Sequence, residues 1–122
     1  MSTILIVDDE QSILDVVAAI LERERHVTFK AHDAEGAMSV IARGGIDAAL
    51  VDVVLPGRGG LDLLMEIRKD YPDLPVIIMS GKVRTDSRPF TTLARQFGAK
   101  GILPKPFTPK ELIESLSTAL PE

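Results

Sequence analysis

The chain has 122 residues, enough for one hydrophobic core but too few for two domains of ordinary size. Lys and Arg number 14 against 18 Asp and Glu, and the net charge of −4 argues against direct binding of nucleic acid, which needs a basic face. The absence of cysteine excludes disulfides, thiolate zinc sites and cysteine nucleophiles. No apolar run approaches the roughly 18 residues of a membrane span, and Met1-Ser2-Thr3 lacks the basic start of a secretory signal. We therefore expect a cytoplasmic protein of one domain, residues 1–122, with no membrane contact.

Short apolar runs alternate with amphipathic helical segments along the chain. The runs predict strands at residues 4–7, 27–31, 48–51, 75–79 and 101–103. Apolar residues at helical spacing predict helices through 13–21, through 37–41 with a stop at Gly44-Gly45, from Leu61, from about Pro89 to Phe97, and from the capping pattern at Thr108. Three methionines fall at apolar positions and are expected in the core: Met38, Met65 and Met79.

The strands at 4–7, 48–51 and 75–79 are continuous apolar runs rather than alternating ones. Strands of this kind are buried on both faces, as in a parallel sheet with helices on each side. The strand at 27–31 is more polar, which predicts a place near a sheet edge. Because crossovers between parallel strands are right-handed, five strand–helix units predict a doubly wound α/β sheet with five helices.

Residues with reactive or ligating side chains follow the strands at their carboxyl ends, where ligands bind in such sheets. Asp8 and Asp9 follow the first strand, Asp52 the third, Ser80 the fourth and Lys105 the fifth. Carboxylate oxygens suit a divalent cation such as Mg²⁺, which takes few protein ligands and keeps several waters. Each residue also has an ordinary structural interpretation, as a helix cap, a turn residue or a solvated lysine. Their conjunction at one edge favours a functional site.

The chain resembles the receiver domain of two-component response regulators. The resemblance covers essentially all 122 residues and rests on motifs in the family's order: Asp8-Asp9, Asp52 followed by Leu55-Pro56-Gly57 and Gly60, Ser80, and Lys105-Pro106-Phe107. It implies a flavodoxin-like sheet with strand order 2-1-3-4-5. It also implies a cis peptide bond between Lys105 and Pro106.

The resemblance assigns roles to the same residues. Asp52 would be the phosphoacceptor, a carboxylate nucleophile that forms an aspartyl phosphate. Lys105 would pair with one phosphoryl oxygen, and Ser80 would hydrogen-bond another and move toward it as the switch. The implied ligands of Mg²⁺ are Asp8 (mainly through a bound water), Asp9, Asp52 and the backbone carbonyl of Val54.

The implied function is a signalling switch that takes its phosphoryl group from a sensor histidine kinase or a histidine phosphotransfer protein. The change would pass through the surface of the fourth helix, fifth strand and fifth helix to a downstream protein or output domain that the sequence does not identify. By analogy with the family, the same surface would allow a phosphorylation-dependent homodimer. The chain would catalyse only its own phosphorylation and dephosphorylation, so we do not expect an enzyme with an external substrate.

Three departures from the family pattern bear on the switch. Ile102 stands where the family usually has an aromatic residue, and its other interpretation is an ordinary strand residue. The stretch between Ser80 and Lys105 is a few residues longer than expected for the family, which indicates either a partner-recognition loop or a tolerated insertion at 81–88. Val54 and Lys82 stand where relatives control the loss of the phosphoryl group. Because Val54 is apolar, we hypothesise a long-lived phosphorylated form. The alternative interpretation is that Lys82 simply points to solvent.

Two other functions compete with the switch. One is a phosphorylation-independent interaction module on the same fold, which Ile102 and the altered loop favour. The other is a Mg²⁺-dependent phosphohydrolase with Asp52 or Asp8 as nucleophile. Such enzymes typically place an Asp-x-Asp arrangement after the first strand, which the tandem Asp8-Asp9-Glu10 does not match.

Overall fold

The computed structural model describes residues 1–80 and 88–120. In this part of the chain the strands form a five-stranded parallel sheet in the order β2-β1-β3-β4-β5. The strands are β1 (Thr3–Val7), β2 (Val27–Ala31), β3 (Ala48–Asp52), β4 (Val76–Ser80) and β5 (Gly101–Pro104). The predicted sheet and strand order are confirmed, and the more polar second strand lies at a sheet edge.

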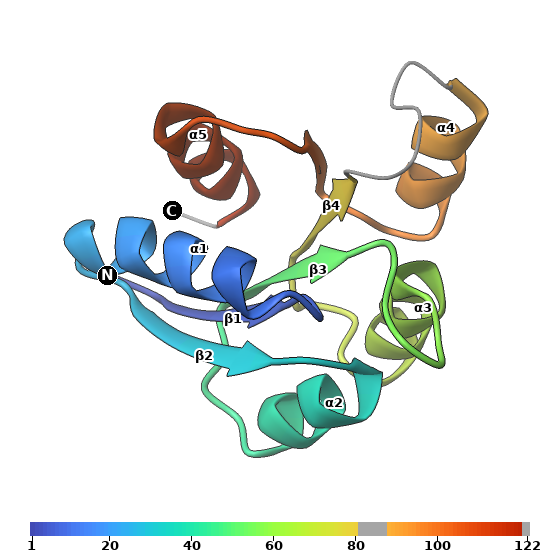
Figure 1. Ribbon diagram of the computed structural model, residues 1–122. Coiled ribbons are helices and arrows are strands. Elements are labelled where there is room, and N and C mark those ends of the chain that lie inside the picture. Colours follow the sequence, from blue (N-terminus) through green and yellow to red (C-terminus); the bar gives the residue numbers. More distant parts are fainter. Residues whose placement is uncertain (81–87, 121–122) are drawn as a thin grey trace.

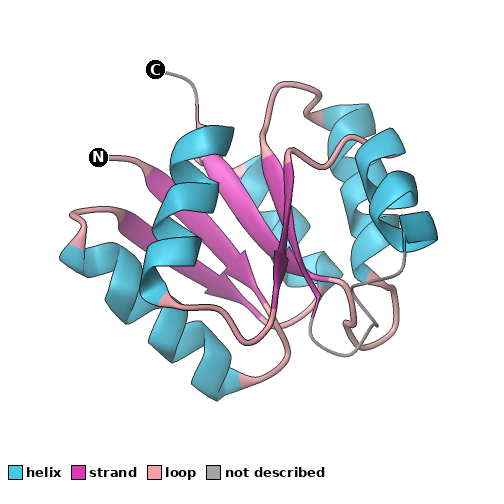
Figure 2. Ribbon diagram, turned by 90° about the horizontal axis from the view of Figure 1, so that it is seen from above, coloured by secondary structure: helices cyan, strands magenta, loops and turns pink. Residues whose placement is uncertain are grey.

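Helices follow the strands and cover both faces of the sheet (Figures 1 and 2). Within the described ranges they are α1 (Gln11–Arg23), α2 (Ala34–Ala42), α3 (Gly60–Asp70), α4 (Arg88–Gln96) and α5 (Pro109–Ala119). Helices α1 and α5 pack on one face, and α2, α3 and α4 pack on the other. None of these helices is long and apolar enough to cross a membrane.

Each face of the sheet buries its own apolar layer, because successive side chains of a strand point to opposite sides. Ile4 and Ile6 of β1 pack against α1 and α5. Leu5 and Val7 of the same strand pack against the layer formed by α2, α3 and α4. Burial on both sides explains why β1, β3 and β4 are continuous apolar runs. Their parallel pairing places their carboxyl ends at one edge of the molecule.

One of the three methionines predicted in the core is not there. Met79 is fully buried and Met38 packs against the core, but the side chain of Met65 is 48% exposed. Helix α3 turns Leu63, Leu64 and Ile67 toward the sheet instead. Met65 lies on the opposite side of α3 because the buried stripe is narrower than the spread of its apolar residues.

The fifth helix begins with the predicted capping box. The Thr108 hydroxyl accepts a hydrogen bond from the Glu111 amide at 3.1 Å, and the Glu111 carboxylate accepts one from the Thr108 amide at 2.8 Å. This start fixes the short connection from β5 to α5, which carries Lys105.

Candidate functional site

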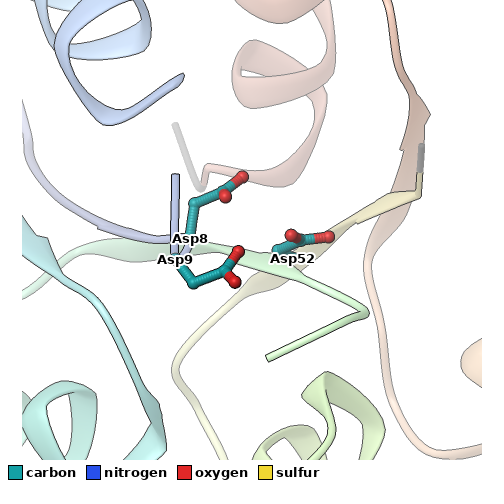
Figure 3. Close-up of side chains that lie close together, drawn as sticks. All are labelled: Asp8, Asp9 and Asp52. Carbon is teal, nitrogen blue, oxygen red and sulfur yellow. The ribbon is translucent and has the colours of Figure 1, made fainter. Parts of the chain in front are cut away.

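An acidic cluster lies at the carboxyl edge of the sheet. Asp8 follows β1 directly and Asp52 is the last residue of β3, and the parallel pairing of Val7 with Val51 brings them to the same edge. The close-up in Figure 3 shows Asp8, Asp9 and Asp52 together, and one carboxylate oxygen of each lies within 4.8 Å of the others. Asp8 and Asp52 are buried, whereas Asp9 is exposed. The structure therefore brings together the three aspartates that the sequence singled out.

Lys105 reaches this cluster from the connection between β5 and α5. Its Nζ lies 2.7 Å from Asp8 Oδ2 and 3.4 Å from Asp52 Oδ2. The lysine side chain is only 15% exposed. A single cation thus compensates two buried carboxylates, which would repel each other strongly without it. The peptide bond from Lys105 to Pro106 is cis, as the resemblance implied.

Backbone amides hold the other oxygens of the two buried carboxylates. Asp8 Oδ1 accepts a hydrogen bond from the Glu10 amide at 3.0 Å, and Asp52 Oδ1 accepts a longer one from the Val54 amide at 3.3 Å. Each carboxylate is therefore held between an amide on one oxygen and Lys105 on the other. Of the two, Asp52 has the longer contact on both sides, so it is the less tightly bound carboxylate.

The surroundings shift the protonation of two of these groups. Burial raises the pKa of the Asp52 carboxyl above its ordinary value, and the neighbouring Asp8 charge adds to the rise against the opposing effects of Lys105 and Val54. Burial alone would lower the pKa of Lys105, but its hydrogen bond to Asp8 and the charges of both aspartates outweigh burial and raise it. Lys105 therefore remains a cation at neutral pH.

Ser80 ends β4 beside this cluster and is fully buried. Its Oγ has no hydrogen-bond partner in the part of the chain that the structure describes. A buried hydroxyl without a partner carries a desolvation cost, so it is a group with bonding capacity to spare. Backbone hydrogen bonds join the segments around Ser80. The Lys105 amide donates to the Ser80 carbonyl at 3.3 Å, and the Val53 amide donates to the Met79 carbonyl at 2.9 Å.

The structure describes two of the residues that depart from the family pattern, Ile102 and Val54. Ile102 of β5 pairs with Ile78 and packs, half-buried, against the core beneath α2, α3 and α4, as an ordinary strand residue does. Val54, whose amide donates to Asp52, is 45% exposed. Lys82 and the insertion expected before α4 lie outside the described residues, apart from Arg88, which begins that helix.

One residue beside the site was noticed in the sequence only as part of a motif. Gly60 begins α3, and its amide donates to the Val53 carbonyl at 2.9 Å, which closes the loop after Asp52. A Cβ at this position would lie 2.1 Å from the backbone carbonyl oxygen of Asp52, far inside any van der Waals contact. Glycine is therefore required for the loop to pack against Asp52. The family motif singled out Gly60, but nothing in the sequence offered a physical reason to prefer it to the neighbouring Gly59, where a Cβ would have room.

The donor set at this edge fits a small divalent cation. Three carboxylates converge, two of them buried and one, Asp9, exposed to solvent. Hard oxygen ligands in small number, with room for water, are the environment that Mg²⁺ prefers. The backbone carbonyl of Val54 stays a predicted ligand.

Comparison with known proteins identifies the class that this fold and this acidic edge define. Residues 4–117 match the family model of the response regulator receiver domain, and the chain belongs to that family. Membership implies a part in two-component signalling by phosphorylation.

Individual relatives are more than a third identical to the chain over the aligned residues. It is 39% identical over 117 residues to the regulatory protein VanR of Enterococcus faecium and 35% identical over 118 residues to the response regulator GtcR of Aneurinibacillus migulanus. These matches take in 96% and 97% of this chain but only 49% and 47% of the relatives, so the chain spans about half of their length. The receiver domain of NtrX from Brucella abortus superimposes with a TM-score of 0.88 at 39% identity, covering 96% of this chain and 97% of that one.

Proposed function

We propose that the chain is a phosphorylation-activated switch in which Asp52 accepts a phosphoryl group. The observation that carries the proposal is the environment of this carboxylate, which is buried yet has the looser contacts of the buried pair, beside a cation and two further carboxylates. A carboxylate with only a structural role would have short hydrogen bonds or ion pairs on both of its oxygens. Asp52 instead keeps oxygens with long contacts of 3.3 and 3.4 Å, which a new bond can replace.

The phosphoryl donor in this proposal is a phosphorylated histidine of a sensor kinase or of a histidine phosphotransfer protein. An oxygen of Asp52 forms a bond to phosphorus while the bond from phosphorus to the imidazole nitrogen breaks. The electron pair of that bond stays on the nitrogen, and the product is an aspartyl phosphate. The raised pKa of Asp52, caused first by burial, makes its carboxylate more basic than an ordinary one.

Asp8, Asp9 and Asp52 would hold Mg²⁺ in this reaction, with the Val54 carbonyl as the predicted fourth ligand. The cation, when bound, supplies positive charge against the oxygens of the phosphoryl group during transfer. The residues of the chain do the rest: Asp8 and Asp9 position the ion, and Lys105 supports the phosphoryl oxygens as a point charge.

Ser80 would complete the phosphorylated state. Its buried hydroxyl, which has no partner among the described residues, would donate a hydrogen bond to a phosphoryl oxygen on Asp52. Because Ser80 ends β4 and Lys105 follows β5, the two groups that respond to phosphate belong to the strands beside α4 and α5. We propose that the signal passes to a downstream partner or output domain through the surface of α4, β5 and α5, in the cytoplasm, and that phosphorylation promotes a homodimer there.

The proposed switch has no external substrate and catalyses only its own phosphotransfer and autodephosphorylation. A phosphorylation-independent interaction module remains the second candidate, because Ile102 is an ordinary half-buried strand residue with no ring to report on Ser80. Incubation with acetyl phosphate and Mg²⁺ followed by intact-mass spectrometry separates the two. The switch gains one phosphoryl group, and the gain disappears in Asp52→Asn and when Mg²⁺ is withheld. An unchanged mass together with unchanged partner binding after kinase treatment supports the module instead.

A further inference from the structure

The side chain of Arg68 joins two connections that lead into neighbouring strands. Arg68 lies in the last turn of α3, and its Nη1 donates a hydrogen bond at 3.2 Å to the carbonyl of Leu74, in the connection from α3 to β4. The same side chain lies against Gly98, in the connection from α4 to β5. Helices α3 and α4 cover the same face of the sheet (Figure 1). None of these three residues belongs to the acidic cluster.

Gly98 makes room for the arginine because it has no Cβ. A Cβ at this position would lie 2.7 Å from Arg68 Nε, 2.9 Å from Cδ and 3.0 Å from Cγ, which is too close for van der Waals contact. The φ angle of Gly98 is 102°, in the left-handed region that favours glycine. Its amide donates to the Arg95 carbonyl at 3.0 Å and so closes the last turn of α4. The carboxyl end of α4 therefore rests directly on the Arg68 side chain.

A cation suits this position. The carbonyls at the carboxyl ends of helices carry partial negative charge, and Arg68 lies in the last turn of α3 while it contacts the end of α4. The hydrogen bond to Leu74 holds the guanidinium, so a displacement of the stem away from Gly98 would disturb that bond. Arg68 thus fixes the carboxyl end of α4 to the connection between α3 and β4.

The contact lies at the amino ends of β4 and β5. Leu74 stands two residues before β4, and Gly98 stands three residues before β5. The Lys100 amide donates to the Val76 carbonyl at 2.8 Å, which ties the two connections together at this end. Ser80, the last residue of β4, is a strand length away, roughly 15 Å. The arginine and the proposed phosphate-responsive serine therefore lie at opposite ends of the same strand.

We propose that Arg68 is a positioning residue that keeps the carboxyl end of α4 fixed while phosphorylation rearranges the other end of the helix. The proposal rests on the proposed function, because it concerns how the surface of α4, β5 and α5 responds to phosphate. A change at Ser80 acts on the amino end of α4, whereas Arg68 holds the carboxyl end at Gly98. The helix therefore turns about Gly98 and is not displaced as a whole.

A double-mutant cycle tests the contact in the unmodified chain. Gly98→Ala should lower the urea midpoint more than Gly44→Ala does. Gly44 is the matched control, because it has a φ of 87° and its amide donates to the carbonyl three residues earlier, but no atom lies within 4 Å of its Cβ. In an Arg68→Ala chain, the excess loss at Gly98 should disappear. Equal losses in the two glycine variants, or an excess that persists without the arginine, would overturn the proposal.

Amide hydrogen exchange, followed by NMR with Mg²⁺ and beryllium trifluoride, tests the fixed end. In the parent chain the Ser80 amide should respond to this phosphoryl mimic, while the Gly98 and Ala99 amides keep their exchange rates. Arg68→Met keeps an apolar stem but loses the donor to Leu74, so Gly98 and Ala99 should exchange at least about fivefold faster once the mimic is bound. The same variant should show a smaller increase without the mimic, which separates positioning from a general loss of stability.

Two further variants serve as controls. Arg68→Lys keeps an N–H donor and should restore much of the protection. Lys69→Met removes the same charge from the neighbouring, exposed position and should behave as the parent chain does.

Two exchange results would overturn the fixed end. One is a parent chain in which Gly98 and Ala99 respond to the mimic as strongly as Ser80. The other is an Arg68→Met chain in which both amides exchange as in the parent. A chain in which the mimic changes no amide at all would contradict the proposed function, and the fixed end with it.

Discussion

The ammonium group of Lys105 lies 2.7 Å from Asp8 Oδ2, closer than the 3.4 Å that separates it from Asp52 Oδ2. Lys105 therefore pairs chiefly with a carboxylate that is not the proposed phosphoacceptor. Asp8 is 0% exposed and would be a buried charge without this partner. The lysine thus stabilises the acidic edge in the absence of a metal ion while leaving Asp52 comparatively free.

Replacement of Lys105 by Met should destabilise the fold, because it leaves two buried carboxylates without their cation. The expected loss in the free energy of unfolding is about 2 kcal/mol, below that of a fully buried pair because water reaches the lysine. Since the pKa of Lys105 is raised in the folded state, this contribution is complete at neutral pH and lost only as the pH rises through the folded value. Urea unfolding with and without Mg²⁺ measures it, and the ion should restore part of the loss. Lys30→Met, which breaks an exposed pair with Asp15, is the control and should cost much less than Lys105→Met. An unchanged stability in Lys105→Met would contradict the assigned role.

Replacement of Asp52 by Asn should stabilise the protein at neutral pH. Burial raises the pKa of Asp52 in the folded state, so folding favours the protonated carboxyl. The corresponding stability is present below the ordinary Asp pKa of about 3.9 and is lost as the pH rises through the folded value. Asn cannot ionise, so the variant keeps the stability that the parent chain loses when Asp52 ionises. The variant should therefore have the higher free energy of unfolding at neutral pH, and the difference should disappear in acid. Thermal unfolding at both pH values checks the sign, with the exposed Asp62→Asn as control. A gain of the same size in acid would mean that ionisation is not its cause.

Gly60→Ala should damage the site and the fold together. Its Cβ would meet the Asp52 carbonyl oxygen at 2.1 Å, so the loop must move, at an expected cost of about 3 kcal/mol. Gly59→Ala is the matched control, because the nearest atom to its Cβ is 3.8 Å away. The free energy of unfolding in urea and the rate of phosphorylation by acetyl phosphate should both fall for Gly60→Ala. Both should hardly change for Gly59→Ala. Similar behaviour of the two variants would show that the loop does not depend on this contact.

Ser80→Ala should lower the stability of the phosphorylated state without lowering that of the unmodified chain. Removal of a buried hydroxyl that lacks a partner among the described residues should leave the unfolding free energy of the unmodified chain unchanged or slightly raised. The phosphoryl mimic beryllium trifluoride should stabilise the parent chain, and the variant should lose about 1.5–3 kcal/mol of that gain, as for a hydrogen bond to a charged group. Thermal unfolding with and without the mimic provides both numbers. Full stabilisation of the variant would remove Ser80 from the switch.

A long-lived aspartyl phosphate is expected from the position of Val54. Val54 is exposed two residues after Asp52, and its side chain has no polar atom with which to orient an attacking water. Val54→Asn should therefore shorten the half-life of the phosphorylated chain, measured as loss of phosphate by intact mass. Met65→Asn makes a comparable apolar-to-polar change at an exposed position on α3 and should leave the half-life unchanged. A parent half-life of only seconds would contradict the expectation.

The fold could be predicted from the sequence because burial on both faces leaves an unmistakable pattern. The runs Ile4–Val7 and Ala48–Val51 have no polar residue, which is the composition of a parallel strand covered by helices on both faces. Met65 shows where the pattern fails. Periodicity marks it as a candidate for the apolar stripe of α3, but the sheet accommodates only the narrower stripe around Leu63 and Ile67.

The members of the site were predictable, and its internal contacts were not. Parallel strands end at one edge, so Asp8, Asp52 and Ser80 had to converge once the strands were located. The preference of Lys105 for Asp8 depends on a difference of 0.7 Å between two contacts, which no spacing along the chain encodes. The role of Gly60 likewise depends on where the loop after Asp52 folds back.

The central claim is that Asp52 itself carries the phosphoryl group. After treatment with acetyl phosphate and Mg²⁺, reduction with borohydride converts an aspartyl phosphate to homoserine, and peptide sequencing by mass spectrometry locates the converted residue. The account predicts conversion at position 52 and at neither Asp8 nor Asp9. Conversion at Asp8 or Asp9 while Asp52 stays intact would contradict it, and so would a phosphorylated chain whose phosphate lies on a hydroxyl or imidazole.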